Sequence, residues 1–201
     1  MFGLWGRAED RACRRRSHKI RWSRAPSYSL AVTWSADRVR HLLNHEVPFL
    51  WRFHRVHHSD LNMDVSTATR FHIGELAISR VIKISLVFFI GATLLGVLIF
   101  ESALVLCAQF HHSSLAVPSW FEKISWVFFV PPSMHRIHHS AVIRERNTNY
   151  GTIFSTWDRA IGTLLKEVDQ TRIRIGVGAY QRPEKLGFRH LLVMPFTRPI
   201  W

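Results

Sequence analysis

Most of the histidines in this chain are spaced so that they could bind metal ions. Two or three histidines lie three or four residues apart in each of three short segments, and two single histidines lie between the second and third segments. These ten of the 13 histidines are His41 and His45; His54, His57 and His58; His72; His112; and His135, His138 and His139. Side chains three and four residues apart project from the same side of a helix, so each segment can direct its imidazoles to one point. Neutral imidazole is a ligand for Fe, Zn, Cu and Ni.

The number of histidines predicts a site with two metal ions. Ten nitrogens are too many for one ion, whereas two ions with about five ligands each would use them, and two-metal sites are a known catalytic arrangement. A lone histidine in an apolar context is usually a packed core residue, which is the alternative reading for His72 and His111. The repeated spacing argues against that reading for the three segments. We assign no role to His18 and His190.

A long apolar block separates the second and third histidine segments and must position them. It runs from Leu76 to Phe110, and Ile84 to Phe100 contains no charged residue. As a single helix of 35 residues the block would measure about 52 Å, against about 30 Å for a bilayer core. Gly91 and Gly96 offer places to turn. We therefore predict two helices, at about 75–90 and 93–112, that form a membrane hairpin and return His112 close to His72. The alternative is a core hairpin of a soluble protein.

The hairpin would place two opposite charges at the same depth. With a turn near residue 92, Lys83 lies about nine residues before the turn and Glu101 about nine after it. Pairing would reduce the cost of placing either charge in lipid. We predict an ion pair; the alternative is that Lys83 extends to an interface.

Positive charge is concentrated in the first 40 residues. They hold ten Lys and Arg and three acids, a net +7 of the +13 carried by the chain. We expect residues 1–36 to be an Arg-rich, poorly ordered arm. Disorder of most of the chain is excluded, because 47% of its residues are hydrophobic. The two cysteines, Cys13 and Cys107, cannot make a disulfide framework.

The segments after the hairpin carry weaker signals. Aromatic residues from Trp120 to Phe129 predict a helix at the membrane interface, which the prolines at 131 and 132 end. The alternation from Thr171 to Ile175 predicts a short strand. Residues 166–201 form the expected C-terminal tail, in which nothing predicts chemistry.

The histidine segments resemble the fatty acid hydroxylase/sterol desaturase superfamily. Its signature is H-x-x-x-H followed by two copies of H-x-x-H-H, which here read His41–His45, His54–His58 and His135–His139. The resemblance covers about residues 37–165. Matching flanking sequences are Leu50-Trp51-Arg52-Phe53, Thr69-Arg70-Phe71-His72, Phe110-His111-His112-Ser113, Asn149-Tyr150-Gly151, Trp157-Asp158-Arg159 and Gly162-Thr163.

The resemblance implies a fold and a site. The fold would be all-α and integral to the membrane, with a transmembrane hairpin at about 75–112 and a histidine-rich helical cap at the membrane surface. The ligands would be the eight histidines of the three segments, with His72 and His112 as additions and His111 left out. Their other ring nitrogens need acceptors. The candidates are Asp60, Asp64, Asp158 and the amide of Asn149, and the alternative for each is a helix cap or a surface ion pair.

The resemblance also implies an activity. A non-haem di-iron centre would use O₂ to hydroxylate or desaturate a sterol or fatty acyl lipid in lipid biosynthesis, with no catalytic residue beyond the metal ligands. Zinc has no redox chemistry, so zinc would be a substitute for iron. Because no G-x-G-x-x-G motif or haem domain is visible, we expect a separate electron donor, cytochrome b5-like or a ferredoxin with its reductase. Arginines around the histidine segments predict that they face the cytoplasm. No nucleic-acid partner is expected.

One departure and several alternatives remain open. Family members usually carry transmembrane helices before the first segment, where this chain has its Arg-rich arm, so we expect a truncated or misassigned start up to about residue 40. The alternatives to the enzyme are a non-redox zinc membrane protein, an inactive metal-binding homologue, and a nucleic-acid-binding protein that uses the arm. A zinc hydrolase would need His-Glu-x-x-His, which begins at His45 but lacks its second histidine.

Overall fold

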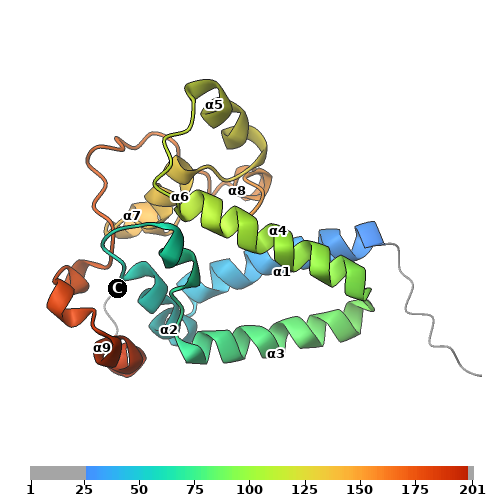
Figure 1. Cartoon of the computed structure of the whole chain (residues 1–201), viewed down its shortest axis with the longest axis horizontal. Coiled ribbons are helices and arrows are strands. Elements are labelled where there is room, and N and C mark those ends of the chain that lie inside the picture. Colours follow the sequence, from blue (N-terminus) through green and yellow to red (C-terminus); the bar gives the residue numbers. More distant parts are fainter. Residues whose placement is uncertain (1–25, 199–201) are drawn as a thin grey trace, which may run out of the picture.

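The computed structural model describes residues 26–198, with side chains from residue 33 onward, and its regular elements are helical. The α-helices are α1 Pro26–Glu46, α2 Pro48–His58, α3 Ile73–Ile90, α4 Leu94–His112, α5 Ser119–Phe128, α6 Pro132–His138, α7 Ile143–Arg146, α8 Thr156–Ile161 and α9 Phe188–Val193 (Figure 1). Short 3₁₀ helices are η1 Val65–Thr69, η2 Gly178–Tyr180, η3 Pro183–Lys185 and η4 Met194–Phe196. The described part of the chain contains no strand, which agrees with the predicted all-α class.

Helix α1 corrects the expected extent of the arm. It begins at Pro26 and crosses the expected boundary at residue 37 without a break. Contacts with residues far along the chain anchor it: the Arg38 guanidinium donates to Thr163 Oγ1 (2.9 Å), and the Thr152 hydroxyl donates to Asp37 (2.7 Å). Residues 26–36 are helical as the continuation of the helix that these contacts anchor at Asp37 and Arg38. The rest of the predicted arm, residues 1–25, lies outside the described residues.

A proline turns the chain back between α1 and α2. Pro48 occupies the first turn of α2, where its missing N–H costs no hydrogen bond. The two helices pack against each other. The first histidine segment, in the last turns of α1, consequently lies beside the second segment on α2.

Helices α3 and α4 form the predicted hairpin. Gly91 ends α3 with φ 66°, the left-handed conformation that glycine adopts without strain. The Thr93 hydroxyl caps α4 by accepting from the Gly96 N–H (3.1 Å). Both helices pack on α1 (Figure 1) and expose large apolar side chains, including Phe89 at 88%. Among the described residues, α4 alone is long and apolar enough to span a membrane.

The predicted ion pair between the two helices is confirmed. Lys83 Nζ lies 2.8 Å from Glu101 Oε1 and 3.0 Å from Oε2. Each charge therefore has its partner halfway along an apolar hairpin.

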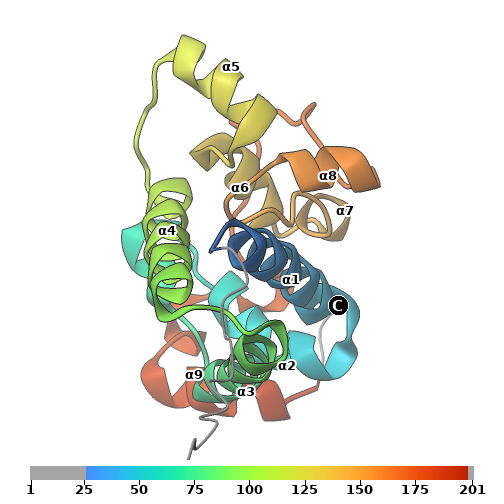
Figure 2. The ribbon, with the colours of Figure 1, turned by 90° about the vertical axis from the view of Figure 1, so that its right-hand side faces the viewer.

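The remaining helices complete a cap at the end of the hairpin that is far from its turn. Helix α6, which carries the third histidine segment, packs against α4. The predicted helix after the hairpin is present as α5, which lies at the opposite edge of the molecule from α9 (Figures 1 and 2).

The C-terminal segment is held to the cap without a strand. The Arg55 guanidinium is buried and donates to the carbonyls of Met194 and Arg198. The strand predicted at 171–175 is wrong: Ile175 forms a single isolated bridge with Ser140, because no neighbouring extended segment continues the pairing.

Candidate metal centre

Nine buried histidines gather into two clusters in the cap. The ligand nitrogens within each cluster lie within 4.8 Å of one another. The first cluster contains His41, His45, His54, His58 and His138, and the second contains His57, His112, His135 and His139. These nine residues belong to the predicted set of ten.

Each H-x-x-H-H segment contributes to both clusters. His54 and His58 of α2 join the first cluster, whereas His57 joins the second. Consecutive residues on a helix point about 100° apart, so His57 and His58 diverge. The third segment splits in the opposite sense, with His138 in the first cluster and His135 in the second. The two clusters are consequently neighbours, and the His58 and His139 rings stack across them with centroids 4.3 Å apart.

Backbone carbonyls fix the tautomer of three rings. The Nδ1 atoms of His41, His138 and His112 lie 2.9, 2.8 and 2.7 Å from the carbonyl oxygens of Tyr150, Thr148 and Ala108, respectively. A carbonyl only accepts, so each Nδ1 carries the proton and donates it. The Nε2 atom of each ring is left with a free lone pair directed into its cluster.

These lone pairs face one another at distances that suit metal ligation. His41 Nε2 lies 3.1 Å from His138 Nε2, although neither atom has a proton to donate. His112 Nε2 likewise lies 3.1 Å from His135 Nε2 and 3.2 Å from the Nε2 atoms of His57 and His139. Nitrogens at about 2.1 Å from one ion would be about 3.0 Å apart at right angles.

Buried ring nitrogens without a hydrogen-bond partner also indicate that the clusters fit metal ions. Both ring nitrogens of His45 and of His58, and Nε2 of His54, are buried without a hydrogen-bond partner. Buried polar atoms are normally satisfied, and an ion in the first cluster would satisfy one nitrogen of each ring. The donor set therefore fits two ions that accept imidazole.

Burial keeps these rings in the form that binds metal. It lowers the pKa of His41, His45, His57 and His58 well below the usual value. It also lowers the pKa of His138 to about 3, against the opposing hydrogen bond with the Thr148 carbonyl. A protonated imidazole cannot bind a metal ion, so the neutral form is the ligand form.

The carboxylate that lies beside the clusters belongs to Glu75, which the sequence analysis did not identify as a candidate. Glu75, in the first turn of α3, accepts from His54 Nδ1 (2.7 Å) and from Asn44 Nδ2 (3.0 Å). It is 4% exposed. A signal was available in the sequence: Glu75 is an acid at the edge of the apolar block, three residues after His72.

The acids at 60 and 64 that were predicted to orient the imidazoles have structural roles instead. Asp64 caps η1, where it accepts from the Ser66 N–H (2.7 Å). Asp60 accepts from the Thr67 hydroxyl (2.8 Å) and pairs with Arg70 (3.5 Å). These contacts correspond to the cap and ion-pair alternatives.

Asp158 and Asn149 stabilise a loop that contacts the imidazoles, rather than contacting the imidazoles themselves. Asp158 accepts from the backbone N–H groups of Tyr150 (3.0 Å) and Gly151 (2.7 Å). Asn149 has φ 54° and donates to the Leu165 carbonyl (3.0 Å). Together they hold the loop of residues 148–151, whose carbonyls accept from His41 and His138. Neither side chain is hydrogen-bonded to an imidazole.

Two further buried histidines, His72 and His111, lie outside the clusters. His72, predicted as an additional ligand, caps α3: its Nδ1 accepts from the Gly74 N–H (2.9 Å) and its Nε2 donates to the Leu192 carbonyl (3.2 Å). Both of its nitrogens are used away from the clusters. His111, which was left out of the predicted set, is buried with its ring centroid 4.0 Å from that of His135.

A cavity of about 240 Å³ borders both clusters. His57, His112 and His135 line one end of it, and the walls come largely from α3 and α4. Its lining includes apolar side chains such as Leu76 and Leu104, so the cavity can hold hydrocarbon beside the imidazoles.

Comparisons with known proteins agree with this arrangement. The family model described as fatty acid hydroxylase matches residues 28–163. The chain is 32% identical over 162 residues to ornithine lipid hydroxylase OlsE of Rhizobium tropici, covering 79% of the chain and 46% of that protein. It is 29% identical over 128 residues to cholesterol 25-hydroxylase of Homo sapiens (63% and 46%) and 26% identical over 155 residues to alkylglycerol monooxygenase of Homo sapiens (75% and 33%). The matches thus span less than half the length of these relatives. No solved structure matches the chain significantly.

Proposed function

Because the chain belongs to the fatty acid hydroxylase family, we propose that it is an O₂-dependent lipid hydroxylase in lipid biosynthesis, whose two histidine clusters each hold one iron ion. The observation that carries this proposal is the pair of buried imidazole clusters beside a cavity lined by an apolar hairpin. Hydroxylation is favoured over desaturation, because the relatives named above are hydroxylases or a monooxygenase.

The two irons would supply the redox chemistry that unactivated C–H bonds require. The overall reaction inserts one oxygen atom of O₂ into a C–H bond and releases the other as water, with two electrons and two protons from outside. The nine clustered histidines are the proposed ligands. The chain keeps these imidazoles neutral by burial, and the carbonyls of Thr148, Tyr150 and Ala108 orient three of them. The cavity holds the lipid against the second cluster and excludes water.

The proposal includes a membrane setting and an electron donor. Helices α3 and α4 would lie in the bilayer, with Lys83 and Glu101 paired so that neither charge is alone there. The exposed Arg144 and Arg159 beside the cap favour its cytoplasmic placement. A cytochrome b5-like protein, or a ferredoxin with its reductase, would supply the electrons.

The experiment compares lipids and metal content in cells that express the chain and its His138→Ala variant. We expect hydroxylated lipids only with the unmutated chain, and about two irons per purified chain, reduced in the variant. His190→Ala is the matched control, because His190 is exposed and outside the clusters. Identical lipid profiles, with metal still bound in the unmutated protein, would contradict the hydroxylase proposal. Bound zinc under iron-replete growth would favour the non-redox alternative.

A further inference from the structure

The cavity beside the second cluster has a charged far end. Along α3 it is lined by Leu76, Ser79 and Lys83. Along α4 it is lined by Glu101 and Leu104 before it reaches the histidine end. These positions are three, four or seven residues apart and so share one face of each helix. The cavity therefore follows the two helices lengthwise, from the imidazoles to the ion pair.

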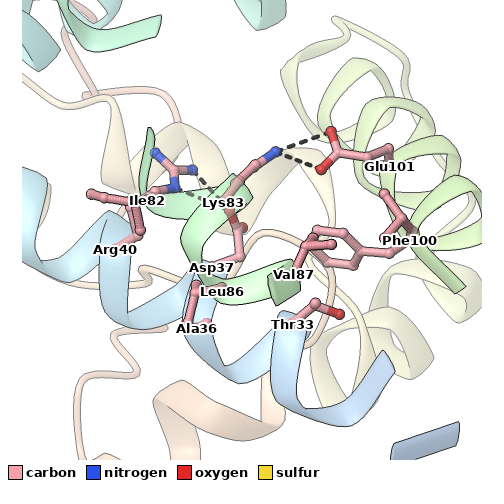
Figure 3. A pocket seen from close by; sticks show the side chains of 11 residues that line it. Thr33, Ala36, Asp37, Arg40, Ile82, Lys83, Leu86, Val87, Phe100 and Glu101 are labelled. Carbon is pink, nitrogen blue, oxygen red and sulfur yellow. Dashed lines mark hydrogen bonds and ion pairs between the residues drawn. The ribbon is translucent and has the colours of Figure 1, made fainter. Parts of the chain in front are cut away.

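The ion pair crosses the space between the two helices. Helices α3 and α4 both pack on α1 rather than closely on each other, and Lys83 reaches from one to Glu101 on the other (Figure 3). A second, smaller cavity of about 30 Å³ lies on the side nearer the hairpin turn, where Val87 and Phe100 line it. Lys83 and Glu101 border both cavities, so the pair separates them.

A second pair on α1 adds to this boundary. Arg40 borders both cavities as well, and its Nη2 atom lies 2.8 Å from Asp37 Oδ1 (Figure 3). A hydrocarbon tail offers no hydrogen bonds, so a tail that separated these groups would leave their charges unpaired in an apolar region. Breaking a pair in such surroundings is strongly unfavourable.

We propose that the Lys83–Glu101 pair forms the end of the substrate cavity and sets how much hydrocarbon tail fits beyond the carbon that is oxidised. This inference rests on the lipid hydroxylation proposed above, and it assigns the substrate a flexible alkyl tail whose terminal methyl group lies against the pair. From the helical rise, the pair lies about 10 Å from the histidine end along α3, measured from Lys83 to Leu76. Along α4 the distance is about 16 Å, measured from Glu101 to His112. The oxidised position is then counted from the methyl end of the tail.

The test replaces the pair in two ways. Lys83→Ala with Glu101→Ala removes both the charge and the bulk, and so joins the two cavities. Lys83→Met with Glu101→Gln removes the charge and keeps similar bulk. Each protein is supplied with lipids of increasing tail length, and mass spectrometry locates the new hydroxyl group. Retention of the same lipids by the purified, metal-free proteins gives a second readout that does not depend on turnover.

We expect the unmutated protein to oxidise at a constant distance from the methyl end. The Met/Gln variant has no charges to keep paired, so the tail should pass further and the new hydroxyl group should lie further from the methyl end. In the Ala/Ala variant that distance should increase by at least one carbon, and the tail length that is retained best should increase. An unchanged oxidised position and unchanged lipid retention in both variants would overturn the proposal. If the Ala/Ala variant does not fold, Leu104→Phe decides: added bulk above the pair should move oxidation towards the methyl end, and no movement overturns the inference.

The outcomes separate the two proposals. An unmutated protein that oxidises no lipid contradicts the hydroxylase function itself. A hydroxylase whose oxidised position does not respond to these variants contradicts only the role of the ion pair.

Discussion

Single atoms decide which nitrogen of each histidine is available to a metal ion. Where a carbonyl or a carboxylate accepts from Nδ1, as Tyr150 does for His41 and Glu75 does for His54, the Nε2 lone pair is left to face the cluster. Such acceptors also raise the basicity of the ligand. Glu75 differs from the carbonyls in being a side chain, so it is the acceptor whose effect can be tested by substitution.

Removing the Glu75 carboxylate should weaken metal binding in the first cluster. Glu75→Ala leaves His54 Nδ1 and Asn44 Nδ2 without their acceptor, and loss of such partners typically reduces metal affinity by about 10- to 100-fold. Glu75→Gln keeps an oxygen that can accept from His54 and should lose less. The measurement is iron retained per chain during titration with a chelator.

The exposed Glu184 supplies the control for this prediction, and Glu184→Ala should retain iron as the unmutated chain does. Equal iron retention in Glu75→Ala and Glu184→Ala would show that the carboxylate does not support the site.

At the scale of elements, sequence spacing predicts which helical segments form this site but not how these segments assemble. Histidines at i, i+3 and i+4 identify the helical segments, and Gly91 correctly locates the hairpin turn. Helix geometry makes His57 and His58 diverge, but which histidines of the other helices join each of them depends on tertiary packing, which no local pattern encodes. The acceptors of three rings are backbone carbonyls, and a carbonyl leaves no signature in a sequence. His72 shows the opposite limit, because the spacing cannot distinguish a helix cap from a ligand.

The loop of residues 148–151 is an element whose packing can be tested directly. A Cβ atom on Gly151 would lie 2.6 Å from the Phe154 carbonyl oxygen and 2.9 Å from Asp158 Oδ2. Gly151→Ala must therefore displace the backbone, and overpacking of this kind typically costs about 1–3 kcal/mol. Since the loop presents the Thr148 and Tyr150 carbonyls, we expect a lower melting temperature together with a loss of bound iron.

Gly178→Ala is the matched control, because a Cβ atom there meets nothing within 4 Å. Melting temperature and iron content should stay close to those of the unmutated protein. If Gly151→Ala melts and binds iron as Gly178→Ala does, the loop tolerates displacement and does not fix the two rings.

For the whole molecule, the site makes folding depend on keeping many imidazoles neutral. The histidine-rich cap buries these side chains at the end of an apolar hairpin, and the sequence predicts both parts. It does not predict that helix α1 already begins at Pro26. It also does not predict that Arg55 anchors the C-terminal segment, because that contact joins residues far apart in the chain. Because the buried imidazoles come from several helices, their protonation should affect the stability of the whole fold.

The metal-free protein should lose stability as the pH falls below about 6.5, the usual pKa of histidine. Burial lowers the pKa of His138 to about 3, and it lowers the pKa of His45 and His58 well below the usual value. Below about pH 6.5 the unfolded chain binds protons that the folded chain does not, so the free energy of unfolding falls by up to about 1.4 kcal/mol per pH unit for each such histidine. Circular dichroism in a neutral detergent with a chelator would measure the melting temperature.

The range between about pH 6.5 and 5 isolates this effect, because carboxylates titrate mainly near pH 4. His45→Gln removes one of the buried groups, so its melting temperature should fall less steeply with pH than that of the unmutated chain. His190→Ala, which changes an exposed histidine, should follow the unmutated chain. Added metal should oppose the fall, since an ion that binds neutral imidazoles competes with protons. A melting temperature that stays constant over this pH range would mean that the clusters are not buried as neutral imidazoles.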